Sequence, residues 1–345
     1  MKLLIITQKV DKEDDILGFF HHWVEKFSEK LEKLYVVCLW QGEYHLPDNV
    51  EVFSLGKEKG ESKIKYIFRF YKYIWKLKKE YDWVFVHMNP IYVVLGGAFW
   101  KIWKKKIYLW YNHHYGSIIL KSAIKIADSV FYTSPFSFSS KFKKSKIMPA
   151  GIDTEIFKRN NKIQKIPNSI LSLGRISPIK NIDVLIEAAK SLDKEGIGFT
   201  LNIVGEPGEK HQEYFQKLKE LSRDLEINGK IKFLGKVPNY MTPASYNQNE
   251  VFINLSPPGL FDKTVLEAMA CESLVLVSST AFKNILPEYL TFKEKNPEDL
   301  KNKILNIFRM KKEEKEILVR ELREKVVQNH NLYILVGKLI QEFKR

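Results

Sequence analysis

Residues 170–181 read ILSLGRISPIKN, a short apolar run that leads through a polar loop into a helical pattern. The apolar run ends at Gly174 and the helical pattern starts near Asn181, so Arg175 and Lys180 lie in the connecting loop. In open α/β sheets, ligands bind at the carboxyl ends of the parallel strands. An arginine fork and a lysine point charge at this edge suit a diphosphate. A solvated loop that caps a helix is the alternative, and the residue chemistry leaves both open.

A second strand–loop–helix unit follows in residues 251–271, VFINLSPPGLFDKTVLEAMAC. The Pro/Gly loop after the strand leads into a helix that we expect to open at Lys263, Thr264 and Val265. Unpaired N–H groups at a helix start bind anions and sugar oxygens. Glu267 lies about one turn further on the same side, where its carboxylate can accept two hydroxyl hydrogen bonds from a ribose or hexose. In the alternative interpretation, Glu267 only stabilises the helix dipole.

The rest of the chain repeats this alternation of short apolar runs and helical patterns. We expect strands at Leu3–Thr7, Leu34–Leu39, Trp83–His87, Lys106–Trp110, Ser129–Thr133, Ile170–Leu173, Phe199–Val204, Ile231–Phe233, Val251–Leu255 and Leu274–Val277. We expect helices at 16–33, 62–80, 91–104, 117–127, 181–194, 208–226, 264–271, 297–309 and 312–328. Strands that alternate with helices of this length predict an α/β fold with parallel sheets. The unbroken apolar character of most strands indicates sheets that are covered on both faces.

The length of 345 residues suits two domains. A polar stretch without periodicity at about 155–168 is typical of a linker. We therefore expect one domain at 1–157 and a second at 158–331. The final segment, 332–345, has apolar residues at helical spacing, and we expect this helix to join the first domain.

Cysteine usage and hydropathy limit where the protein works. Cys38 and Cys271 lie inside apolar runs far apart in the chain, which favours two buried thiols in a reducing compartment. The apolar run Leu3–Ile6 is too short for a signal peptide, and Ile91–Trp100 is about half of a membrane span. We expect a cytoplasmic protein that is soluble or peripheral on the membrane.

The net charge of +15 is concentrated in the first half of the chain. Residues 57–106 contain thirteen Lys and Arg against four acidic residues. The segment 63–81 adds seven aromatic residues to seven of these cations, more than one buried helix stripe needs. A basic and aromatic helix suits an anionic membrane surface, and a plain solvated face is the alternative. Nucleic acid is a poor candidate, because no nucleic-acid-binding motif is present.

The order and spacing of several motifs resemble glycosyltransferase family 4. The motifs that carry the resemblance are GRISPIKN, VFINLSPPGLFDKTVLEAMACESLVLVS and MPAGIDTEIF, with LWYNHHYGS and ADSVFYTS in the first half. The resemblance covers nearly the whole chain and implies the GT-B fold, in which two Rossmann-like domains face each other across a cleft. It also implies a retaining, metal-independent transfer of a sugar from a UDP- or GDP-linked donor, with an acceptor-binding first domain and a donor-binding second domain.

The resemblance implies roles for residues of the second half. Glu267 matches the second of two glutamates in the family's pattern and would hold the nucleotide ribose. The first glutamate of the pattern falls on Gly259, which has no side chain. Asp262 stands where a glycine is common in the family. Its carboxylate would partly substitute for the missing first glutamate. The remaining donor-binding candidates, at the ends of their strands, are Gly174, Gly205 and Val237.

Two residues of the first half also match the family's pattern. His113 falls on a histidine that lies beside the reactive sugar, and Gly18 falls in a loop that approaches donor and acceptor. Together with Arg175, Lys180 and Glu267, His113 completes the predicted catalytic set. In the alternative interpretation His113 is structural, since a lone histidine in a loop at the end of a strand usually is.

The resemblance predicts a glycan or polyprenyl-linked acceptor, and thus a role in cell-surface polysaccharide or glycolipid synthesis. We expect no metal and no cofactor, because no Asp-x-Asp motif and no His/Cys cluster at ligand spacing is apparent. Two alternatives stay open: a catalytically altered GT-B protein that binds nucleotide or membrane, which Gly259 favours, and a nucleotide-sugar epimerase. A dinucleotide-dependent oxidoreductase is a poor candidate, since no Gly-x-Gly-x-x-Gly follows the first strand.

Overall fold

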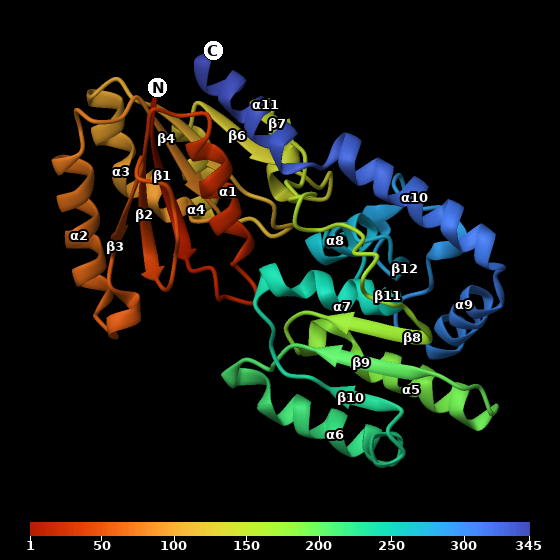
Figure 1. The fold of residues 1–345 in the computed structure, drawn as a ribbon. Coiled ribbons are helices and arrows are strands. Elements are labelled where there is room, and N and C mark those ends of the chain that lie inside the picture. Colours follow the sequence, from red (N-terminus) through yellow and green to blue (C-terminus); the bar gives the residue numbers. More distant parts are fainter. The chain divides into compact units, whose positions relative to one another are not determined.

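The computed structural model describes residues 1–345, which fall into two units. Unit 1 comprises Met1–Gly151 and Leu332–Arg345, and unit 2 comprises Ile152–Asn331. Each unit has its own parallel sheet with helices packed beside it (Figure 1). The chain leaves unit 1 at Gly151, whereas the sequence-based expectation placed this change at 157/158.

The sheet of unit 1 has seven parallel strands in the order β3-β2-β1-β4-β5-β6-β7. The strands are β1 (Lys2–Val10), β2 (Lys33–Gln41), β3 (Val50–Ser54), β4 (Trp83–His87), β5 (Lys106–Trp110), β6 (Ser129–Tyr132) and β7 (Ser145–Ile147). Because the order runs outward in both directions from β1, the connecting helices cover both faces of the sheet. The predicted α/β class is confirmed.

Two apolar clusters pack on the opposite faces of this sheet. Along β1, Leu3 and Ile5 belong to one cluster, and Leu4 and Ile6 belong to the other. The helices of unit 1 are α1 (Phe19–Ser28), α2 (Lys63–Lys76), α3 (Pro90–Ile102), α4 (Ile118–Ile126) and α11 (Leu332–Lys344). Helices α1 and α11 cover the first face, and α2 and α3 cover the second (Figure 1). Both faces are buried, so the strand is an unbroken apolar run.

The C-terminal helix α11 packs into unit 1 although 180 residues of unit 2 precede it. Leu335, Leu339 and Phe343 are buried in the same cluster as α1. The ring of Phe343 lies 4.6 Å from that of Tyr108 on β5, and the Tyr108 hydroxyl donates to the carbonyl oxygen of Glu342 at 3.2 Å. Burial of its apolar face fixes this helix to the first sheet.

Unit 2 contains a five-stranded parallel sheet in the order β10-β9-β8-β11-β12. Its strands are β8 (Ile166–Leu173), β9 (Thr200–Val204), β10 (Ile231–Phe233), β11 (Asn249–Asn254) and β12 (Leu274–Val277). Its helices are α5 (Ile182–Lys194), α6 (Gln212–Ile227), α7 (Thr242–Gln248), α8 (Lys263–Ala270), α9 (Pro297–Arg309) and α10 (Lys312–Asn329). Helix α5 packs against α6 and α9, while α8 packs against α10.

The structure corrects several predicted elements. The short edge strands β3 and β7 and the helix α7 were missed, because a partly exposed edge strand lacks a continuous apolar run. The helix expected at 16–33 covers only Phe19–Ser28. The preceding residues form a loop in which Asp14 Oδ1 accepts the backbone N–H groups of Ile16 and Leu17. Such local side-chain bonds compete with helix formation.

Two further expectations are tested by the structure. Cys38 and Cys271 are both buried and free, as predicted. None of the helices combines the length and the apolar character needed to cross a membrane.

Candidate active site

Glycines mark the carboxyl edge of the unit 2 sheet. Gly174, Gly205 and Gly235 follow β8, β9 and β10 with φ angles of 138°, 137° and 71°, a region that L-residues rarely adopt. The Gly174 N–H donates to Val204, and the Gly205 N–H donates to Gly235. A Cβ atom on Gly205 would lie only 2.0 Å from the carbonyl oxygen of Gly174. The edge therefore exposes backbone without side chains. The half-buried Val237 follows β10.

Lys180 joins the two loops that the sequence singled out. It ends the 3-10 turn Pro178–Lys180 after β8. Its Nζ donates to Asp262 Oδ2 at 2.5 Å and to Ser256 Oγ at 3.0 Å, and both acceptors belong to the loop between β11 and α8. A cation is thus held at the start of α8 by residues 76 and 82 positions away in the chain.

Asp262 stands at the N-cap of α8 but does not cap the helix. Its Oδ2 instead accepts from Lys180, from Ser256 Oγ and from Asn254 Nδ2. Burial raises the pKa of Asp262, but the charge of Lys180 and these hydrogen bonds outweigh it and hold the pKa below its ordinary value. An N-cap aspartate normally accepts the N–H of the second or third helical residue. Here those N–H groups do not bind the cap side chain.

The first turn of α8 combines a lysine, a hydroxyl and a buried valine. Burial lowers the pKa of Lys263 to about 7, against the opposing charge of Glu267. The buried Oγ1 of Thr264 has no hydrogen-bond partner in the structure. Val265 is fully buried, and its N–H already donates to the Asp262 carbonyl at 3.3 Å. Of the predicted donor-binding residues here, Thr264 therefore offers a hydrogen-bonding group that the fold itself does not use.

Glu267 is 3% exposed and is held by two polar side chains. Its Oε1 accepts from Asn239 Nδ2 at 3.2 Å, and its Oε2 accepts from the Tyr246 hydroxyl at 3.1 Å. Burial raises the pKa of Glu267, and the two hydrogen bonds and Lys263 offset only part of this effect. Each oxygen retains a lone pair for a further hydroxyl donor. Sequence reasoning missed Asn239 and Tyr246, because single polar residues in a helix and a turn carry no motif.

Arg175 differs from Lys180 in having no ion pair. It follows Gly174 directly and is exposed. The structure thus brings Lys180, Asp262 and Ser256 together and leaves the guanidinium of Arg175 in solvent at the same strand end. Asn254 and Ser256 are further members of this cluster that the sequence analysis did not select.

In unit 1, His113 lies in a well-fixed loop after β5. Its carbonyl oxygen accepts from the Phe138 N–H at 2.9 Å, while the neighbouring Asn112 Oδ1 accepts from the N–H groups of Thr133 and Ser134. Surrounding protein atoms, and then the adjacent His114, lower the pKa of His113. The lowered pKa favours the neutral imidazole, which can both donate and accept a hydrogen bond.

Gly18 is buried at the start of α1, also in unit 1. Its φ of −55° is an ordinary helical value that any residue adopts. Its N–H donates to the carbonyl oxygen of Asp14, and the Asp14 carboxylate pairs with Lys9 at 2.5 Å. The loop between β1 and α1 is thus held by Asp14 and does not depend on the conformational freedom of glycine.

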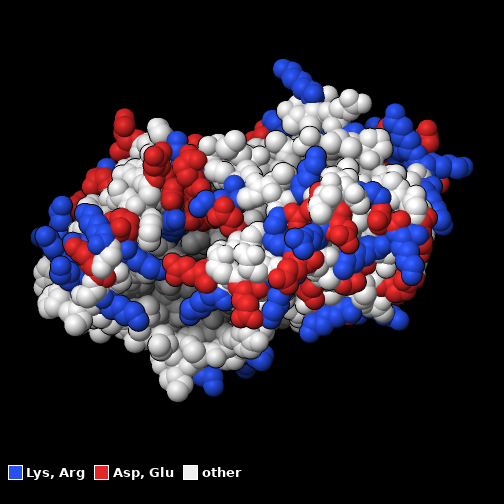
Figure 2. Space-filling view, turned by 90° about the horizontal axis from the view of Figure 1, so that it is seen from below, with Lys and Arg blue, Asp and Glu red and all other residues white.

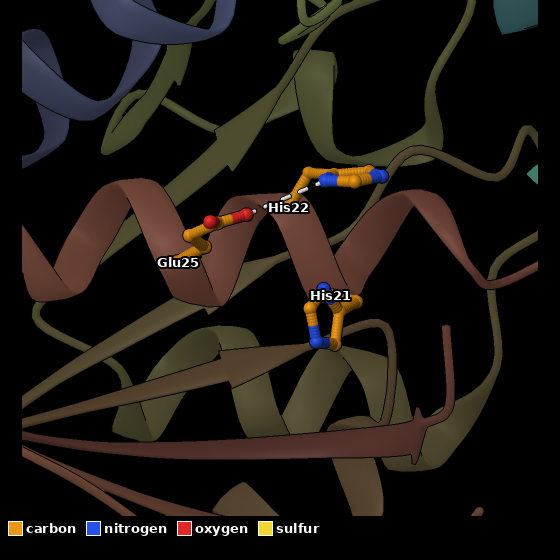
Figure 3. Close-up of side chains that lie close together, drawn as sticks. All are labelled: His21, His22 and Glu25. Carbon is orange, nitrogen blue, oxygen red and sulfur yellow. Dashed lines mark ion pairs between the residues drawn. The ribbon is translucent and has the colours of Figure 1, made fainter. Parts of the chain in front are cut away.

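Three residues of metal-binding types lie together in α1. The ligand atoms of His21, His22 and Glu25 are within 4.8 Å of one another, and Figure 3 shows Glu25 beside His22. However, the His45 N–H donates to His21 Nε2 at 3.2 Å, so the proton of the neutral ring is on Nδ1. A metal-bound histidine instead donates through its second nitrogen. The cluster fits a His22–Glu25 contact (3.5 Å) better than a metal centre, and metal independence stays a prediction.

Two α/β units, each with a parallel sheet, define a protein of the GT-B fold class. Solved structures support this fold. HepE from Anabaena in complex with UDP has a TM-score of 0.79 and 16% identity over 100% of both chains. Sucrose-phosphate synthase from Thermosynechococcus elongatus has a TM-score of 0.82 and 16% identity over 100% of this chain and 98% of that chain.

The chain belongs to the family of group 1 glycosyl transferases, whose model matches residues 153–329. It is also similar to the alpha-monoglucosyldiacylglycerol synthase of Streptococcus pneumoniae, with 28% identity over 156 residues. This alignment covers 41% of the chain and 34% of the relative, so the chain matches about a third of that protein's length.

Proposed function

We propose that the protein is a retaining family 4 glycosyltransferase that moves a sugar from a UDP- or GDP-sugar to a glycan or lipid-linked acceptor. The observation that carries the proposal is the position of Lys180, which binds Ser256 and Asp262 at the start of α8. UDP-glucose is the first donor to test, because a similar structure, HepE, is described in complex with UDP-glucose. The glucosyl-lipid name of the pneumococcal relative supports a lipid acceptor.

The central task of this mechanism is departure of the nucleoside diphosphate. Lys180 would exchange the Asp262 carboxylate for a donor phosphate, with Arg175 and the first N–H groups of α8 as further positive partners. These groups stabilise the charge that develops on the leaving oxygen, which is electrostatic preorganisation. The acceptor hydroxyl would attack from the leaving-group face and pass its proton to a donor phosphate oxygen. The scheme uses cations of the chain where other enzymes use a metal.

Gly259 bears on how the donor sugar is held. Its φ of 85° lies in the left-handed region, so a glutamate placed there would be strained. We propose that Asp262 takes over part of this role. The three hydrogen bonds of its carboxylate all end at Oδ2, which leaves Oδ1 to accept from a sugar hydroxyl.

We further propose that α2 places the enzyme on an anionic membrane, at the cytoplasmic face. Ile64, Phe68 and Trp75 are 67%, 72% and 52% exposed and share one stripe of α2, opposite the buried Phe70 and Ile74. Lysines flank this stripe, and Figure 2 shows Lys and Arg side chains along the left edge, the side on which α2 lies in Figure 1. An exposed apolar stripe with flanking cations suits an anionic membrane surface.

The membrane proposal is tested by sedimentation with vesicles that contain anionic lipid. We expect the Phe68→Ser/Trp75→Ser variant to bind at least about tenfold more weakly, because two large apolar side chains leave the interface. A matched control is Tyr289→Ser, which removes an aromatic residue of similar exposure from unit 2. Equal binding of the wild type to neutral and anionic vesicles would contradict an anionic surface.

The transferase proposal is tested by incubating the protein with UDP-glucose and GDP-sugars, with and without polyprenyl-linked and diacylglycerol acceptors. We expect a product with the donor's anomeric configuration, formed equally well in the presence of a chelator. Gly259 favours one competing function, a GT-B protein that binds nucleotide without catalysis. Tight nucleotide binding with no transfer to any acceptor would support that alternative.

A further inference from the structure

A second cavity lies within unit 2, at the opposite edge of the sheet from the glycines. Its volume is about 310 Å³. The wall includes residues at the amino ends of three strands, namely Ile166 of β8, Glu250 of β11 and Leu274 of β12, together with Lys312 at the start of α10. Because the strands are parallel, their amino ends lie one strand length away from the carboxyl ends, where the candidate donor site lies.

Two cations in the wall of this cavity have no carboxylate partner. The Arg159 guanidinium donates to the backbone and side-chain oxygens of Asn247 and to the carbonyl oxygen of Ile163. The Lys165 ammonium donates only to the carbonyl oxygen of Asn249, at 3.3 Å. An ammonium has three donors, and the protein occupies one of them here.

The acidic residues of the wall pair with cations other than Arg159 and Lys165. Glu250 accepts from Lys315 at 2.6 Å and from the Asn168 N–H at 2.6 Å. Glu272 lies 3.9 Å from Arg323, and Glu316 lies 3.7 Å from Arg320 and 4.0 Å from Lys312. The carboxylates therefore do not neutralise Arg159 and Lys165.

The pKa of Lys165 agrees with its lack of a carboxylate partner. Burial and then the charge of Arg159 lower the pKa of Lys165 to about 8, and the charges of Glu272 and Glu250 restore only part of it. An anion bound in the cavity would remove the repulsion and supply the missing acceptors. The start of α10, an 18-residue helix, adds its positive end to the same wall.

The cavity also has an apolar wall, formed by Ile166, Pro167, Leu274 and Val319. A bare inorganic anion would leave this wall without contacts, since the volume is several times that of one phosphate group. We propose that the cavity binds a small phosphate monoester, with the phosphate on Arg159 and Lys165 and the organic group against the apolar side chains. A phosphate fits better than a carboxylate, because three oxygens can be shared between an arginine fork and a lysine.

The position of the site in the chain gives it a structural consequence. Arg159 and Lys165 belong to the segment that enters unit 2 after Gly151, and α10 ends two residues before the chain leaves unit 2 at Asn331. A bound phosphate monoester would tie the entering segment to α10. This inference does not depend on the proposed transferase activity.

The test uses pyridoxal 5′-phosphate, a phosphate monoester that carries an aldehyde. The Lys165 amine attacks the aldehyde carbon and water leaves. Borohydride then delivers hydride to the imine carbon and leaves a stable secondary amine, which peptide mass mapping locates. We expect Lys165 to be labelled, and glycerol 2-phosphate to reduce this labelling at least about fivefold while the exposed Lys162 is unaffected. Succinate at equal ionic strength tests a carboxylate in place of the phosphate, and it should protect Lys165 from labelling only weakly.

The contribution of Arg159 is tested by Arg159→Gln, with Arg223→Gln as a control for an exposed arginine outside the cavity. We expect only Arg159→Gln to abolish protection by glycerol 2-phosphate. Labelling of Lys165 that is insensitive to glycerol 2-phosphate in the wild type would overturn the proposal, as would equal protection by succinate.

A second measurement does not depend on aldehyde reactivity. In a Lys180→Ala background, which weakens the donor site, glycerol 2-phosphate should still raise the Tm, and Lys165→Met in the same background should remove this shift. Loss of the shift in Lys180→Ala alone would assign phosphate binding to the donor site and refute the second site. Failure of the transferase assay would leave this result unchanged, so the two proposals fail separately.

Discussion

Lys180 and Lys165 lie at opposite edges of the unit 2 sheet and differ in their partners. Lys180, at the carboxyl edge, lies 2.5 Å from the Asp262 carboxylate. Lys165, at the amino edge, has only a backbone carbonyl at 3.3 Å, and its pKa is lowered to about 8. The carboxylate holds a paired cation in position before the ligand binds, but the ligand must then displace that carboxylate. An unpaired cation destabilises the empty site and gains more when an anion binds.

Lys180→Ala tests the paired cation and has the largest expected effect. If Lys180 neutralises the departing diphosphate, the variant should lose about 10²- to 10³-fold in transfer rate, the usual effect of removing one group that stabilises a developing oxyanion. The measurement is the initial rate of product formation with UDP-glucose. Lys232→Ala, which removes an exposed lysine from β10, is the matched control and should behave as the wild type. A loss of only a few fold would show that the donor diphosphate lies elsewhere.

Asp262→Asn leaves Lys180 without its carboxylate and tests whether that carboxylate competes with the phosphate. The variant should bind UDP about threefold to tenfold more tightly, because the phosphate no longer competes with a fixed negative charge. Transfer should nevertheless slow, since the same side chain is proposed to orient the donor sugar. Calorimetric titration with UDP, followed by the transfer assay, separates the two effects. Weaker UDP binding would mean that Asp262 holds the loop in shape and does not compete with the ligand.

Lys165→Met gives the smallest effect and tests the unpaired edge. Removing a buried charge without a carboxylate partner should stabilise the empty protein by about 1 to 3 kcal/mol, seen as a higher Tm at pH 7. The unfolded chain binds the Lys165 proton up to its ordinary pKa of 10.5, and the folded chain releases it at about 8. Wild-type stability should therefore rise with pH between these values, and the advantage of Lys165→Met should shrink.

The pH dependence needs its own control, because Arg159, Glu250 and Glu272 also face Lys165. Lys162→Met removes an exposed lysine from the same segment and should change neither the Tm nor its pH dependence. If Lys165→Met and Lys162→Met melt alike at every pH, Lys165 is solvated in the empty protein and the contrast with Lys180 disappears.

Much of the fold was predictable from local pattern. The alternation of apolar runs with helical periodicity predicted two parallel α/β units, and the apolar runs in β1 and β8 predicted sheets covered on both faces. The loops that contain Arg175 and Lys180 could be located, because a polar loop after a buried strand is visible in sequence. Edge strands such as β3 were missed, since a half-exposed strand has no continuous apolar signal.

The sequence by itself determined the class of the protein, because hydrophobic periodicity and loop chemistry act over a few neighbouring residues. Only the tertiary structure decided which charges meet. The Lys180–Asp262 pair joins residues 82 positions apart, and Glu267 receives the hydroxyl of Tyr246 from another helix. The Arg159–Lys165 cavity uses residues from 159 to 319. Such contacts depend on strand order and helix packing, which no local pattern contains.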